Sequence, residues 1–412
     1  MLRNSTVELG TIEDDAVGHI RPQTRQPRTR AHTADFVRVV LFTWVVVAHC
    51  VNGIITPETA QPAGLVGTLC HLTRYGFVAV TLFVLVLSTQ KTQMLPIMFW
   101  RKRFGLVAWP YLAWTVIYSI TDHVIIEGNP FTGPGEYFRT LGAHLLTGDG
   151  KYQLYFLLIS MQIYLVFPVV TWLLRRYRNC PWQLLIGGAA VQLLMFVIYQ
   201  YLPRPTGAVW DIVYEHAWKT LPMYALFIVI GAVGAQHLDT VQRWLDDHVI
   251  GVVLAAAVGT AITVAAYVTA TSPGYVPGST TTPWNLTLLP WLVGGFAMLW
   301  LVAMTWNNHR GTGNGVVGRV VAYATPRAFG VFAVHPLVID VLGRAGFLTG
   351  LFSWFPQSGA TRAIILVVVV LAGSLLMVDL LLRTSLSQIL VARKRIPGRV
   401  RIPHYAGLIR PS

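Results

Sequence analysis

The chain of 412 residues is strongly apolar and sparsely charged: hydrophobic residues make up 54% of it and charged residues only 12%. A soluble globular domain carries about twice that charged fraction, so the composition excludes a soluble enzyme. The formal net charge of +14 would suit nucleic acid, but its distribution along the chain indicates a membrane surface and no nucleic-acid partner.

Ten apolar stretches of about 17 to 24 residues follow one another, each long enough to span a bilayer as a helix. They lie at about 36–55, 73–90, 104–123, 152–174, 183–201, 218–236, 249–270, 284–305, 328–345 and 361–383. The sequence therefore predicts an all-α polytopic membrane protein. One ten-helix domain, 36–383, is expected between a basic N-terminal tail, 1–35, and a basic C-terminal tail, 384–412.

The basic residues are distributed unequally between the two sets of predicted loops. With the N-terminus in the cytoplasm, 24 of the 31 Lys and Arg fall on that side. This is the positive-inside bias, which predicts that both termini are cytoplasmic. Because the first 35 residues contain no apolar core, no cleaved signal peptide is expected. The expected location is the plasma (inner) membrane of a bacterial cell.

The three cysteines, Cys50, Cys70 and Cys180, fit neither a metal-ligand spacing nor a disulfide framework. We interpret them as small packing residues, with a Cys50–Cys70 link as the lesser alternative. No metal site is expected.

The first apolar stretch carries the most informative pair of polar residues, Arg38 and His49. Eleven helical residues bring His49 back to within about 20° of Arg38 and roughly 16 Å along the axis. Neither side chain is stable against lipid, so their shared face should line a protein interior or a water-filled cavity. The alternative is an arginine that reaches the interface beside a histidine buried in the core.

A neutral imidazole in the outward half of the bilayer can act as a general base toward a hydroxyl. It can also attack an activated acyl group and carry it transiently. Arg38, together with Lys102 and Arg103 at the start of the third stretch, suits a phosphate-bearing ligand because guanidinium stays charged and pairs with phosphate oxygens. Ordinary topogenic charges explain Lys102 and Arg103 equally well.

Other acidic residues could support such a site. Asp340 in the ninth stretch could orient the imidazole of His49 or pair with Arg344 one turn later, and the pairing is favoured. Asp35 is three residues before Arg38 and could preset its side chain. Near the outer edges, possible contacts for a sugar are Asp122, His123 and Glu215.

Five segments together resemble the membrane acyltransferase 3 family, in matching order from about 35 to 383. They are the Arg-x10-His segment from Asp35 to His49, then RYGFVAVTLFVLVLS, KRFGLVAWPYLAWTVIY, YQLYFLLISMQIYLVFPVV and FGVFAVHPLVI. The chain departs from the family pattern at Leu106, where a second arginine is usual, and at Thr89, Gln153, Tyr155 and Phe332. These departures indicate a divergent branch.

The resemblance implies an enzyme that moves an acyl group, often acetyl, from cytoplasmic acyl-CoA to a sugar hydroxyl on the outer side. It implies a catalytic role for His49, a site role for Arg38 and a secondary role for His335, which matches the late-helix histidine. We therefore expect acetyl-CoA as donor, with Arg38, Lys102 and Arg103 binding it. The expected acceptor is an extracytoplasmic sugar or glycolipid, including a trehalose mycolate-type lipid.

The alternative function is a transporter or flippase for an envelope lipid or sugar. Ten spans with buried polar residues allow it. The absence of a G-x-x-x-x-G-K motif and of a visible internal repeat disfavours it.

Overall fold

The computed structural model describes residues 29–90, 95–128, 131–310 and 315–396. Within these ranges the chain is helical or irregular, apart from one isolated bridge between Ser272 and Tyr275. Among the described residues, nine helical segments are long and apolar enough to cross a membrane. The predicted all-α polytopic fold is confirmed, while most of the N-terminal tail and the end of the C-terminal tail lie outside the described residues.

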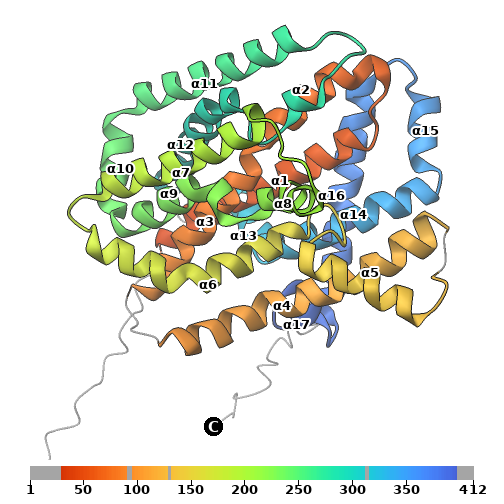
Figure 1. Ribbon diagram of the computed structural model, residues 1–412, viewed down its shortest axis with the longest axis horizontal. Helices are drawn as coiled ribbons and strands as arrows, with labels where there is room; N and C mark the ends of the chain where they lie inside the picture. The colour runs from red at the N-terminus through yellow and green to blue at the C-terminus, as the bar shows by residue number, and fades with distance from the viewer. Residues whose placement is uncertain (1–28, 91–94, 129–130, 311–314, 397–412) are drawn as a thin grey trace, which may run out of the picture.

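The nine segments combine several labelled helices (Figure 1). They are α1 (Thr29–Asn52); η1 (Pro57–Thr59), α2 (Ala60–Cys70) and α3 (Leu72–Thr89); α4 (Pro96–Ile120) with η2 (Thr121–Ile126); α6 (Tyr155–Arg176); α7 (Pro181–Tyr201); α8 (Ala208–His216), η3 (Ala217–Lys219), η4 (Leu221–Tyr224) and α9 (Ala225–Gln236); α11 (Val249–Ala270); η5 (Gly278–Thr281), η6 (Leu286–Leu288) and α12 (Leu289–His309); and α16 (Gly359–Arg383).

The ninth predicted stretch, 328–345, coincides with one helix, which is short and forms a bent pair with the helix before it. Helices α13 (Val316–Ala324) and α14 (Ala328–Arg344) meet at 75°, and α14 alone is only about 26 Å long. Four shorter helices complete the described chain: α5 (Pro134–Thr147), α10 (Leu238–Asp247), α15 (Phe347–Trp354) and α17 (Ser387–Val391).

Helix α1 lies in the middle of the bundle (Figure 1) and packs against α2, α3, α12, α14 and α16. Its sequence explains this position, because apolar residues recur on more than one face. Val37 and Leu41 are buried in one cluster of the core, whereas Val46 and Cys50 are buried in a second. Because α1 is central, its polar residues are kept away from lipid. The shared face of Arg38 and His49 requires this, since neither side chain is stable against lipid.

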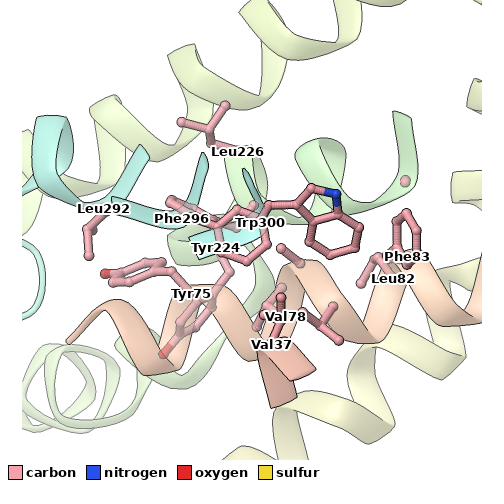
Figure 2. Close-up of a cluster of buried hydrophobic side chains, with 14 of the residues drawn as sticks. Val37, Tyr75, Val78, Leu82, Phe83, Tyr224, Leu226, Leu292, Phe296 and Trp300 are labelled. Carbon is pink, nitrogen blue, oxygen red and sulfur yellow. The ribbon is translucent and has the colours of Figure 1, made fainter. Parts of the chain in front are cut away.

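The first cluster is rich in aromatic rings contributed by α3, α9, α12 and the turn before α9 (Figure 2). Tyr75 lies 5.3 Å from Tyr224 between ring centroids, and Phe83 lies 4.5 Å from Trp300. All four side chains are buried. Such tilted and edge-to-face ring pairs add van der Waals contact that lipid tails cannot supply as well.

Close helix contacts in the bundle depend on glycine. A Cβ at Gly231 of α9 would lie 2.0 Å from the carbonyl oxygen of Ala79 in α3, and one at Gly259 of α11 would lie 2.6 Å from the backbone of Pro290. Small residues at such crossings let two backbones approach, which is how membrane helices gain packing energy.

Candidate active site

His49 lies in the last turn of α1 and lines a cavity of about 380 Å³. We call this the His49 end of the bundle and the opposite end the Arg38 end. The cavity is also lined by His71 and Arg74 at the junction of α2 and α3, and by Tyr152 and Gln153 just before α6. Its volume is within the range of small-molecule sites. His49 is therefore a cavity residue and not a histidine enclosed by the core.

The imidazole of His49 is held between two other rings. Its centroid lies 4.2 Å from the ring of Tyr152 and 5.4 Å from the ring of His335. No hydrogen bond or ion pair joins the imidazole of His49 to any other described residue, and its ring nitrogens are not among the buried atoms that lack a partner. The nitrogens are therefore available to a ligand in the cavity, as a base or a nucleophile must be.

His335 is fully buried behind His49. Its Nδ1 lies 3.1 Å from the carbonyl oxygen of Val331. Because a carbonyl oxygen only accepts, Nδ1 carries the proton and Nε2 of the neutral ring has the lone pair. That Nε2 is buried without a hydrogen-bond partner. His335 thus presents a fixed tautomer and an unused acceptor beside the stacked His49 ring.

The backbone around His335 is bound by a tyrosine from another helix. The hydroxyl of Tyr118 in α4 donates to the carbonyl of Ala333 at 2.7 Å and accepts from the N–H of Leu337 at 3.3 Å. Ala333 and Leu337 are i,i+4 partners in a regular helix, and Pro336 between them has no N–H to donate. Tyr118 therefore provides hydrogen-bond partners for two backbone groups of α14 on either side of His335.

The segment 147–153 brings Tyr152 and Gln153 to the cavity and is fixed by a lysine from elsewhere in the chain. Lys219 donates to the carboxylate of Asp149 and, at 3.0 Å, to the carbonyl of Thr147. Burial raises the pKa of the Asp149 carboxyl, but hydrogen bonds from Lys219 and Thr147 outweigh it, so this pKa lies below its usual value. The carboxylate form is the one that holds Lys219 in place.

A second lysine fixes the same segment from within it. Lys151 contacts both oxygens of Asp122, at 2.8 and 3.0 Å, and one oxygen of Asp340 at 2.9 Å. Asp340 pairs with Lys151 and not with Arg344, so the expected local pairing was wrong. The other option, in which Asp340 orients the imidazole of His49, is not seen either. Asp340 binds Lys151, and it is Tyr152, the residue after Lys151, that packs on His49. Arg344 is exposed.

The predicted sugar contacts do not line the cavity of His49. Asp122 is occupied by Lys151, and Glu215 is exposed and lies 4.0 Å from His216. His123 stacks on Phe131 at 4.0 Å between centroids.

At the Arg38 end, the expected pair of Arg38 with Asp35 is confirmed at 3.9 Å. Arg103 and Arg393 lie within electrostatic range of Arg38, and Arg103 donates to the hydroxyl of Ser88 at 2.8 Å. Helix α4 begins at Pro96, so Lys102 and Arg103 lie inside it. Lys102 is exposed, and its side chain has no hydrogen bond or ion pair with a described residue. The structure therefore gathers Arg103 with Arg38 and leaves Lys102 at the surface.

A larger cavity of about 970 Å³ lies at the Arg38 end, between α3, α4, α6 and α9. Phe99 and Phe167 line it, and so do two cations from the end of α6 and the turn after it, Arg175 and Arg178. Arg103 lies over the ring of Phe99 at 5.9 Å. Sequence reasoning treated Arg175 and Arg178 only as topogenic charges, because nothing local to them indicates a cavity.

Three phenylalanines, Phe77, Phe156 and Phe332, line the cavity of His49 and pack on one another. Phe77 lies 5.6 Å from Phe156 and 6.4 Å from Phe332 between ring centroids. Val45 is the residue of α1 nearest to Arg38 in this lining. The cavity of His49 is therefore lined both by polar side chains, such as Arg74 and Gln153, and by these three apolar rings.

Sequence reasoning assigned no site role to Arg74, Lys151 or Tyr152. Arg74 and Tyr152 only began two of the segments that resemble the family, and Lys151 was counted only as a loop residue. The sequence offered one signal, the position of Arg74 at the start of an apolar stretch. A cation at such a position is also the ordinary sign of a membrane boundary, so it did not indicate a site.

A family model described as an acyltransferase domain matches residues 32–379, which include Arg38, His49 and His335. The chain belongs to the membrane acyltransferase 3 family. This membrane acyltransferase is a multi-pass protein, as its apolar helices require. No curated protein and no solved structure matches the chain.

Proposed function

We propose that this acyltransferase moves an acyl group, acetyl in the first instance, from acyl-CoA to a hydroxyl of a sugar or glycolipid. The observation that carries the proposal is that the imidazole of His49 lines a cavity with no described residue bonded to its nitrogens. The donor would approach from the cytoplasm at the Arg38 end and the acceptor from outside a bacterial plasma membrane at the His49 end.

The donor end has the charges that a coenzyme A head group needs. Arg175 and Arg178 line the larger cavity, and Arg103 lies over Phe99 of its lining, within electrostatic range of Arg38. Guanidinium groups bind phosphate oxygens with paired hydrogen bonds. The apolar lining of the same cavity suits the pantetheine arm, which would run toward His49. Apart from its charge, nothing supports a role for Lys102 in binding coenzyme A.

His49 serves best as general base. Its neutral imidazole takes the proton of the acceptor hydroxyl as that oxygen attacks the thioester carbonyl, and a tetrahedral intermediate forms. The carbon–sulfur bond then breaks, the thiolate of coenzyme A leaves, and it takes the proton back from the imidazolium. The ring of His335, stacked at 5.4 Å, and that of Tyr152 at 4.2 Å hold the imidazole in place through these steps.

The other chemistry open to His49 is to carry the acyl group itself. Attack by a ring nitrogen on the thioester would release coenzyme A before the acceptor binds, leaving an acyl-imidazole. Labelled enzyme recovered after incubation with labelled acetyl-CoA and no acceptor would identify this route. Label found only on the acceptor supports the general base.

The test uses sealed proteoliposomes with labelled acetyl-CoA inside and envelope glycan or lipid outside. His49→Ala should abolish transfer, because a general base contributes about 100- to 10,000-fold. His248→Ala is the matched control, since that histidine is exposed between α10 and α11. Transfer at the wild-type rate by a folded His49→Ala protein would remove His49 from the mechanism. Solute flux without acceptor labelling would favour the transporter alternative instead.

A further inference from the structure

Arg74, on the first turn of α3, differs from the other buried cations in its partners. Lys151 contacts two carboxylates and Lys219 contacts the carboxylate of Asp149. The buried guanidinium of Arg362 donates to two backbone carbonyls at 2.9 Å. Each of these groups therefore has an oxygen acceptor in the protein that offsets its desolvation.

Arg74 has aromatic partners instead. Its guanidinium carbon lies 5.3 Å from the ring centroid of Tyr155 and 5.2 Å from that of Trp218. The hydroxyl of Tyr224 also lies close to it. No ion pair joins it to a carboxylate of the described chain. Aromatic faces orient a guanidinium by its plane and leave donors on its edge unused.

The unused donors face the cavity of His49. Arg74 is half-buried and lines that cavity, together with His49 and His71. The Nε2 of His71 donates to the carbonyl of Thr281 at 2.8 Å, so this nitrogen is already occupied within the protein. No Asp or Glu is among the described residues that line the cavity. Among the described residues of the lining, Arg74 therefore supplies the one permanent positive charge, and no carboxylate opposes it.

We infer that Arg74 binds an acidic group on the acceptor, so that the substrate is a hydroxyl compound that also carries a phosphate or a carboxylate. This rests on the proposed function and names the class of its acceptor. A guanidinium held flat by two rings presents its edge to two oxygens of one anion. The acid would be bound by Arg74 while a neighbouring hydroxyl reaches His49 in the same cavity of about 380 Å³.

The first experiment asks which acceptors the wild-type protein labels. Envelope glycans and lipids of the source cell are separated by anion exchange into neutral, carboxylate-bearing and phosphate-bearing fractions. Each fraction is incubated with nanodisc-reconstituted protein and labelled acetyl-CoA. Label in either acidic fraction is expected, and the fraction that takes it shows which acid Arg74 binds. Label confined to the neutral fraction would overturn the inference while leaving the acyltransferase function intact. No label in any fraction, with acetyl-CoA unconsumed, would overturn both.

The second experiment uses the labelled acidic fraction and variants of Arg74. Arg74→Gln should raise the KM for the acceptor about ten- to hundredfold, the range of a lost charge-assisted hydrogen bond, with kcat within about threefold. Arg74→Lys keeps the charge and should give a smaller rise, and it provides the test if the glutamine variant does not fold. Arg204 is the control, because it lies over Tyr214 at 5.4 Å but is exposed and outside the cavity. Arg204→Gln should leave KM unchanged. A fall in kcat at constant KM would mean that Arg74 acts on the reacting group, and the inference would then be wrong.

Discussion

Replacing Lys151 with methionine tests whether the segment beside His49 is held by charge. The Nζ of Lys151 lies 2.8 Å from Asp122 and 2.9 Å from Asp340, and the three side chains are 9%, 28% and 17% exposed. In the wild-type protein one ammonium group lies between two carboxyl groups. Methionine fills similar space but leaves two carboxylates together without a counter-ion. The variant should therefore lose both hydrogen bonds and gain a like-charge repulsion.

The magnitude follows from the exposure of these groups. Breaking a fully buried ion pair costs about 3–5 kcal/mol, whereas an exposed pair contributes about 0–1 kcal/mol. The carboxylates are partly exposed and the ammonium is buried, so we expect Lys151→Met to cost about 2–3 kcal/mol. Asp122→Asn removes one of the two negative charges and keeps the Lys151–Asp340 pair. It should cost about 1 kcal/mol or less.

The assay is unfolding by denaturant in mixed micelles, followed by tryptophan fluorescence, with transfer measured on the same preparations. Lys394→Met is the control, because Lys394 is exposed and has no described ion pair, and it should shift stability by less than about 0.5 kcal/mol. Transfer by Lys151→Met should fall about tenfold or more, since Tyr152 follows Lys151 directly and packs on His49. An unfolding midpoint equal to wild type, or a larger loss in Asp122→Asn than in Lys151→Met, would refute the charge-balance reasoning.

Two further substitutions test the packing around the site. Gly231→Ala places a Cβ 2.0 Å from a backbone oxygen of α3, so it should lower the free energy of unfolding by about 1–3 kcal/mol or more. The control Gly234→Ala meets no atom within 4 Å and should be neutral or slightly stabilising. Equal unfolding midpoints for the two variants would contradict the close contact. Tyr118→Phe removes the hydroxyl that bonds to two backbone groups of α14, so it should cost about 1–3 kcal/mol and lower kcat, as the His335 segment loosens. A variant with unchanged stability and unchanged kcat would show that α14 does not need this bond.

The sequence by itself determined the fold class, the approximate positions of the spans and the shared face of Arg38 and His49. These follow from local rules: a helix satisfies its own backbone in lipid, and its period relates residues eleven apart. The Asp35–Arg38 pair was also predictable, because it joins residues three apart on one helix.

Only the tertiary structure decided which distant groups meet. The helical i,i+4 rule predicts that Asp340 pairs with Arg344. In the fold it binds Lys151 instead, which is 189 residues away in the chain. Arg74 and Tyr152 join His49 in one cavity because α3 and the segment before α6 pack beside the end of α1. Such partners depend on how helices rotate and cross, and a single sequence contains no local signal of that geometry.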